Sequence, residues 1–112
     1  MPLITDGQAR ALLVNGLAAR RERRFDPYPV VKLTAAWIDT VWLLSDAMPE
    51  DPDCVFGVRL VKGGSPDLRH VQLSKIAALR GPNGETVECD ESFIADKTLA
   101  GYVQEAMQRR PD

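Results

Sequence analysis

Four short strand-like segments follow one another in the middle of the chain, and they constrain its fold more than any other feature. They are Val30–Ala35, Thr40–Ser45, Val55–Lys62 and Leu68–Leu73. The third segment places Phe56, Val58 and Leu60 on one face and Arg59 on the other, as a half-buried strand does. Turn sequences such as Gly63-Gly64 separate the segments. Short strands joined in this way predict an antiparallel meander.

Helices are predicted before and after the meander in the chain. Apolar residues recur at helical spacing after a capping Thr5 or Asp6; they are Ala9, Leu12, Leu13, Gly16 and Leu17. A short helix is expected from Ser74, and a last helix after Asp96 or Thr98. The expected buried stripe of the last helix is Leu99, Tyr102, Val103 and Met107. Residues 86–89 predict a fifth, edge strand, and the acidic, proline-bracketed residues 46–53 predict a loop.

The length of the chain fits one domain, residues 1–112. The expected fold class is α+β, an antiparallel four- to five-stranded meander sheet with N-terminal and C-terminal helices packed on it. Trp42, Leu44, Val58 and Leu60 are predicted core residues. A hydrophobic content of 45% supports a packed core and argues against wholesale disorder.

Charge and cysteine content narrow the class of protein. The formal net charge is −2, so no overall positive field attracts nucleic acid or a membrane. Cys54 and Cys89 stand 35 positions apart with no metal-ligand spacing, and we expect two free thiols. The sequence has no secretory signal pattern and no apolar run long enough to cross a bilayer. These features favour a cytoplasmic protein.

No motif for catalysis, metal or cofactor binding is recognisable. His70 is the only histidine, and strand alternation places it on the polar face with Gln72. The acidic residues 46–53 lack the glycine and the spacing of a calcium loop. Gly63-Gly64 lacks the lysine of a phosphate loop. We therefore expect a protein that is not an enzyme and needs no metal or cofactor.

A few residues are candidates for interaction with a partner. The basic run Arg20, Arg21, Arg23 and Arg24 is followed by Phe25 and Tyr28, a combination of charge and aromatic faces that single-strand binders use. A solvated helix end explains the same arginines without any nucleic acid. Trp37 is either an exposed interface anchor or a core residue.

Several phrases of the sequence resemble successive blocks of one family. They include Asp26-Pro27-Tyr28-Pro29-Val30-Val31-Lys32-Leu33, Thr40-Val41-Trp42-Leu43-Leu44, Pro49-Glu50-Asp51-Pro52-Asp53 and Val71-Gln72-Leu73-Ser74. Over residues 4–106 the chain is similar to domain-of-unknown-function family 2958, small bacterial proteins carried on plasmids and integrative elements. The chain departs from the family at Phe25, where the family has a histidine, and at residues 58–62, where the family has an acidic Cys-Asp stretch.

The resemblance implies an accessory role in a mobile genetic element and lends no catalytic residue. Together with the absence of catalytic motifs, it favours a non-enzymatic binding module that acts on a protein partner in host defence or plasmid maintenance. The alternative is a nucleic-acid-binding accessory protein that uses residues 20–24. The sequence identifies neither the partner nor the oligomeric state.

Overall fold

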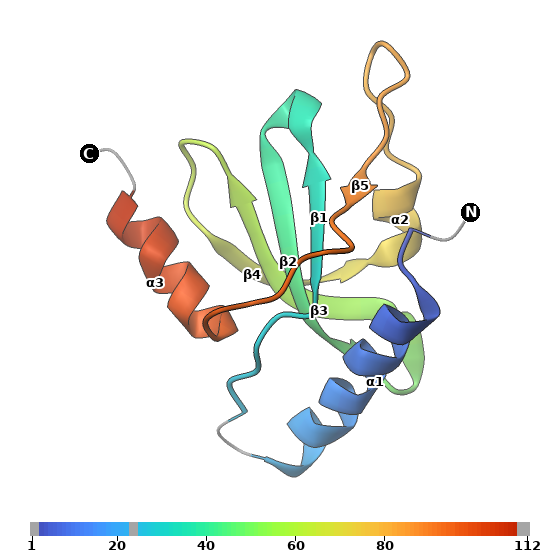
Figure 1. The fold of residues 1–112 in the computed structure, drawn as a ribbon, viewed down its shortest axis with the longest axis vertical. Helices are drawn as coiled ribbons and strands as arrows, with labels where there is room; N and C mark the ends of the chain where they lie inside the picture. The colour runs from blue at the N-terminus through green and yellow to red at the C-terminus, as the bar shows by residue number, and fades with distance from the viewer. Residues whose placement is uncertain (1–2, 23–24, 110–112) are drawn as a thin grey trace.

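The computed structural model describes residues 3–22 and 25–109. Their elements, in chain order, are α1 (Asp6–Arg21), β1 (Val31–Ala35), the 3-10 turn η1 (Ala36–Ile38), β2 (Thr40–Met48), β3 (Asp51–Val61), β4 (Asp67–Gln72), α2 (Leu73–Ala77), β5 (Glu88–Cys89) and α3 (Leu99–Arg109). The strands form one antiparallel sheet in the order β4-β3-β2-β1-β5 (Figure 1). The predicted α+β class and the four-strand meander are confirmed.

The predicted loop over residues 46–53 is wrong. β2 continues to Met48 and β3 begins at Asp51, so the turn itself holds only Pro49 and Glu50. The two prolines are tolerated because one lies in the turn and Pro52 lies beyond the end of β4, whose pairing with β3 starts at Cys54. A proline therefore removes no needed ladder hydrogen bond there. A register shift between Leu44 and Asp46 places a bulge at Ser45.

Helix α1 begins at a complete capping box. Thr5 Oγ1 accepts a hydrogen bond from the Gln8 N–H at 3.1 Å, and Gln8 Oε1 accepts one from the Thr5 N–H at 2.8 Å. Leu12 and Gly16 are the buried residues of the helix, and they lie against β2. Asn15 Nδ2 donates to the Ser45 carbonyl at 2.8 Å, which fixes the helix over the bulge.

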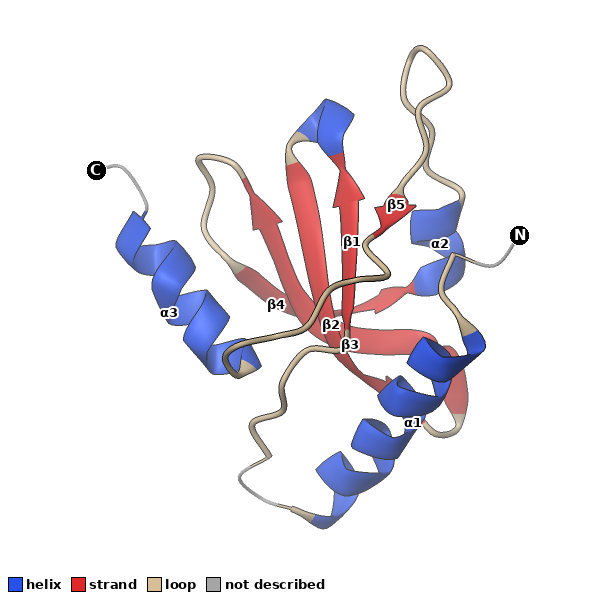
Figure 2. Ribbon diagram, viewed as in Figure 1, coloured by secondary structure: helices blue, strands red, loops and turns tan. Residues whose placement is uncertain are grey.

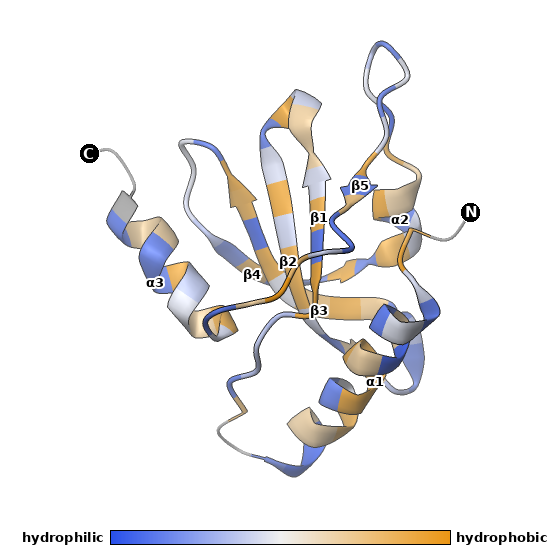
Figure 3. Ribbon diagram, in the orientation of Figure 1, coloured by the Kyte–Doolittle hydropathy of each residue, from blue (hydrophilic) through white to orange (hydrophobic). Residues whose placement is uncertain are grey.

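Both faces of the sheet are covered, and the helices divide between them (Figure 2). α1 and α2 pack on the face that carries Leu33, Trp42 and Leu44. α3 packs on the opposite face, which carries Leu43 and Val58. Hydrophobic residues are concentrated on the central strands, whereas the loop between α2 and β5 is hydrophilic (Figure 3). The alternation of side chains along β2 supplies both layers.

Three of the four predicted core residues are buried. Trp42, Leu44 and Val58 are at most 5% exposed. Leu60 is only half-buried, which corrects the prediction. It shares a face with Val58, but it lies further along β3, where α3 leaves the sheet surface partly open.

The short helix α2 starts one residue before its predicted cap. Its N-cap is Gln72, and Ser74 lies inside the first turn. Ser74 instead binds Asp53, donating from its N–H at 2.9 Å and from its hydroxyl at 2.7 Å. A carboxylate at the first turn of a helix accepts a hydrogen bond from a free N–H group. Asp53, which lies in β3, therefore does for α2 what an N-cap side chain does in other helices.

Candidate functional site

The interaction residues predicted from the sequence lie at separate places in the fold, as far as the structure describes them. Arg20 and Arg21 lie exposed in the last turn of α1, while Arg23 and Arg24 fall outside the described residues. Tyr28, in the connection from α1 to β1, is 53% exposed. Trp37 belongs to η1, which follows β1 and so lies at the other end of that strand (Figure 1).

Two of these residues already have intramolecular partners. Arg20 forms an ion pair with Glu50 in the β2–β3 turn, and both side chains are half-exposed. Trp37 is half-buried and packs against the core cluster under α1 and α2. The charge of Arg20, the first arginine of the run, is therefore partly neutralised by Glu50. Much of the indole of Trp37 packs against the core and is not available to a partner.

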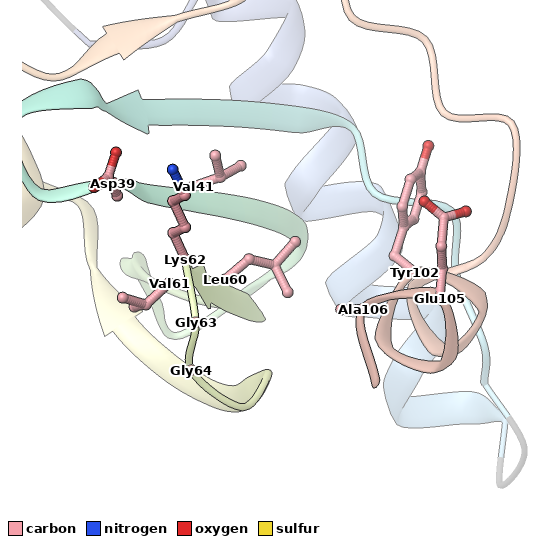
Figure 4. Close-up of a pocket in the computed structure, with 10 residues that line it drawn as sticks. All are labelled: Asp39, Val41, Leu60, Val61, Lys62, Gly63, Gly64, Tyr102, Glu105 and Ala106. Atoms are coloured by element: carbon pink, nitrogen blue, oxygen red, sulfur yellow. The ribbon is translucent and has the colours of Figure 1, made fainter. Parts of the chain in front are cut away.

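The structure brings together a different set of residues, in a groove between α3 and the ends of β2 and β3 (Figure 4). Its volume is about 420 Å³, and its lining residues are Asp39, Val41, Leu60, Val61, Lys62, Gly63, Gly64, Tyr102, Glu105 and Ala106. Apolar side chains from the sheet face those of the helix, and charged groups lie at the rim. We call this feature the α3 groove.

The sheet side of the groove follows from strand register. Val41 pairs with Leu60 across β2 and β3, so both side chains point to the face that α3 covers. A hydrogen bond of 3.0 Å from the Lys62 N–H to the Asp39 carbonyl ties the end of β3 to the turn before β2, and the turn after β3 is closed by a bond of 2.9 Å from the Gly64 N–H to the Val61 carbonyl. Asp39 and Gly63 both have positive φ, 48° and 79°, which gives these turns their tight path.

The helix side of the groove is anchored near the start of α3. Leu99 is buried, and its N–H donates to the Pro27 carbonyl at 2.8 Å. The Tyr102 hydroxyl donates to Asp96 at 3.0 Å. Toward its C-terminal end the helix is less covered, and Met107, a predicted member of its buried stripe, is 62% exposed. Because the anchors are at one end, the other half of α3 borders the open groove.

A compact charge network stands beside this groove. Lys97 Nζ lies 2.9 Å from Asp96 and 3.0 Å from Glu105, and 4.8 Å from the ring centre of Tyr102. The hydrogen bond to Asp96 raises the pKa of Lys97, and the same bond lowers the pKa of Asp96. Burial raises the pKa of Tyr102 above its usual range. Tyr102 therefore carries a neutral hydroxyl at physiological pH, which can donate and accept hydrogen bonds.

A second hollow lies on the same sheet face. It has a volume of about 320 Å³ and is lined by Ala19, Glu22, Phe25, Pro27, Asp46, Phe56 and His70. We call it the Asp46 pocket. Asp46, Phe56 and His70 are register neighbours across β2, β3 and β4. His70 is exposed, as its strand pattern predicts, but its ring lies 4.9 Å from that of Phe56.

Sequence reasoning missed both hollows. It placed Asp46 in a loop, although the residue lies in β2 just after the bulge. It also placed Asp39 in an ordinary turn and Lys62 at the end of the third strand, without giving either a role. The one usable signal was the alternation that places Phe56, Val58 and Leu60 on one face of the third strand, which indicated a covered face without showing where α3 ends.

Thiol and metal chemistry find little support among the residues that the structure covers. Cys54 and Cys89 are free thiols, as expected. Burial is the main cause that raises the pKa of each, and both are therefore protonated and weakly nucleophilic near neutral pH. In ranges 3–22 and 25–109, no three His, Cys, Asp or Glu side chains are placed to hold a metal ion. Nor is any helix there long and apolar enough to cross a membrane.

Comparison with protein families shows which family the chain belongs to. A family model described as "Protein of unknown function (DUF2958)" matches residues 3–110. The chain therefore belongs to this family, and the resemblance seen in its sequence phrases is confirmed. No curated protein and no solved structure gave a significant match.

Proposed function

We propose that this chain is a non-enzymatic binding module that holds a segment of a protein partner in the α3 groove. The observation that carries the proposal is the groove itself, about 420 Å³ with apolar walls from Val41, Leu60 and Ala106. Binding pockets of this size are typically apolar with a few polar groups that set orientation.

The arrangement of the groove indicates what kind of segment fits it. A central apolar area and a polar rim are the usual anatomy of a protein interface. Here the rim offers charges of both signs, from Asp39 and Lys62. We propose that the partner inserts one or two apolar side chains between α3 and the sheet, and that polar groups flank them.

The biological process in which this interaction takes part is proposed from the family resemblance. Members are carried on plasmids and integrative elements, so the partner would belong to host defence or plasmid maintenance, and the module would act in the bacterial cytoplasm. Nucleic-acid binding through residues 20–24 is the second hypothesis, and the ion pair between Arg20 and Glu50 weighs against it.

Affinity capture from the native host, with quantitative mass spectrometry, tests the proposal. The groove variant Ala106→Arg places a long charged side chain over the apolar wall. The control Gln104→Arg makes the same charge change at an exposed site on the same helix, away from the groove lining. We expect Gln104→Arg to retain the partner and Ala106→Arg to lose most of it, with similar melting temperatures for both. Equal capture by the two variants would contradict the groove as the binding surface.

A further inference from the structure

The Asp46 pocket has a chemical character distinct from that of the α3 groove. Two of its lining residues are acids, Glu22 and Asp46, and two are phenylalanines, Phe25 and Phe56. Among the described lining residues, the one group that can carry a positive charge is the imidazole of His70. The carboxylates therefore outnumber the groups that can carry a positive charge among the described lining residues.

Asp46 is a carboxylate with few compensating contacts. Its Oδ1 accepts a hydrogen bond of 2.5 Å from the buried Ser45 hydroxyl. Within the described part of the chain it forms no ion pair. Burial raises the pKa of Asp46, although the Ser45 hydrogen bond and the nearby His70 act in the opposite direction. The carboxylate is thus partly withdrawn from water without an ion pair to a described residue, and a carboxyl with a raised pKa in a hollow is a candidate for a functional site.

The walls of the pocket suit a cation as well. Aromatic rings attract cations through their negative faces, and carboxylates beside such rings strengthen that attraction. The ring of Phe56 is held against His70, with ring planes inclined by 56°. Ala19 and Glu22 belong to the C-terminal end of α1, where the unpaired carbonyls of a helix give a partial negative charge.

The obvious alternatives are less well supported. A metal ion needs several donor side chains together, and none of the described residues form such a group. An anion would meet two carboxylates. Arg20, on the same turn of α1 as Ala19, reaches Glu50 instead of the pocket.

The geometry points to the Asp46 pocket as a binding site for an organic cation, an alkylammonium or guanidinium group. Asp46 supplies the charged hydrogen-bond acceptor, Phe25 and Phe56 supply the aromatic walls, and Glu22 closes the site. The cation is carried either by a lysine or arginine side chain of another protein or by a free amine. This site is independent of the α3 groove and of the partner proposed there.

NMR titration of the backbone amides at pH 8 tests the assignment. The probes are n-butylammonium, Nα-acetyl-arginine amide, Nα-acetyl-lysine amide and the uncharged Nα-acetyl-norleucine amide. We expect saturable shifts at Asp46, Phe56 and His70 with the cations and none with the norleucine compound. Tighter binding of n-butylammonium than of the blocked amino acids would assign the site to a free amine, and the reverse order to a protein side chain.

Three variants make the test specific. Asp46→Asn keeps the shape of the side chain and the acceptor for Ser45, and should weaken cation binding at least about ten-fold, because a hydrogen bond to a charged group is lost. Phe25→Leu keeps apolar bulk without the ring, and should weaken binding about three-fold. Glu88→Gln, on β5 at the opposite edge of the sheet from β4, is the charge-matched control and should bind as the wild type does. Undiminished binding by Asp46→Asn, equal binding of the norleucine compound, or no saturable shift with any cation would overturn the proposal.

Discussion

Gly16 shows how one residue sets the distance between α1 and the sheet. A Cβ atom at this position would overlap the carbonyl oxygen of Ala47 in β2. In an exposed helix, Gly→Ala stabilises by about 1 kcal/mol. Here the helix would have to move away from the strand, and overpacking of this kind costs roughly 1–3 kcal/mol. We expect Gly16→Ala to lower the free energy of unfolding by that amount, measured by urea denaturation.

Gly7 provides the matched control on the same helix. The nearest atom to a Cβ at Gly7 is Thr5 Oγ1, 3.9 Å away, so an alanine fits without movement. Gly7→Ala should leave stability unchanged or raise it by up to about 1 kcal/mol. If the two variants had the same stability, the close contact of Gly16 with β2 would be wrong.

Asp46 allows a prediction about pH. Its pKa is raised in the folded protein, mainly by burial, so the folded state binds the proton more tightly than the unfolded state does. Ionised Asp46 therefore destabilises the fold above its folded pKa, and this penalty disappears as the pH falls below the unfolded value. We expect Asp46→Asn to raise the melting temperature at pH 7, with a gain that shrinks toward pH 3. A constant gain across that range would show that ionisation of Asp46 is not the cause.

Among the strands and helices, the sequence predicted those whose pattern is local. Alternation along Val55–Val61 and the turns between segments were sufficient for four strands and their antiparallel order. The extension of β2 to Met48 was missed because Pro49 and Pro52 suggest a loop unless the lengths of the neighbouring strands are known. The stripe of Leu99, Tyr102, Val103 and Met107 predicted a helix with one apolar face, although Met107 is exposed. It could not say which face of the sheet the helix covers, because both faces of β2 are apolar.

The candidate sites were harder to predict because they depend on tertiary packing. The α3 groove depends on where a helix leaves the sheet, and the Asp46 pocket depends on a bulge at Ser45 and a connection that crosses the sheet face. Both are results of tertiary packing. Among the local signals that the sequence does contain, Arg20 and Arg21 lie in the last turn of α1, and Trp37 lies in a turn that packs against the core.

The two faces of the sheet should differ in how they respond to truncation. Leu44 is 1% exposed beneath α1, whereas Leu60 is half-buried at the α3 groove. Removing the side chain of a fully buried leucine costs about 2–5 kcal/mol. We expect Leu44→Ala to lose stability in that range and Leu60→Ala to lose clearly less, measured as the free energy of unfolding in urea. Equal losses would mean that the groove is closed in solution.

The charge distribution of the whole molecule weighs against nucleic acid. The net charge is −2, and the first arginine of the basic run is paired with an acid of the β2–β3 turn. Affinity for nucleic acid comes largely from phosphate neutralisation and the release of counterions. An arginine that already pairs with a carboxylate of the same protein contributes less affinity for a phosphate. The same acidic turn would repel an extended polyanion lying along the end of α1.

These charges lead to a direct test of the second functional hypothesis. We expect no retardation of single- or double-stranded probes at micromolar protein and physiological salt, in an electrophoretic mobility assay. If the arginines did bind single strands, the logarithm of affinity would fall with the logarithm of salt concentration with a slope of about −0.7 per neutralised phosphate. Replacing Arg20, Arg21, Arg23 and Arg24 with serine would then flatten that slope in proportion to the phosphates that the variant no longer neutralises. Retardation with this arginine-dependent slope would place nucleic acid ahead of a protein partner, because phosphate neutralisation is the one source of affinity that these four residues share.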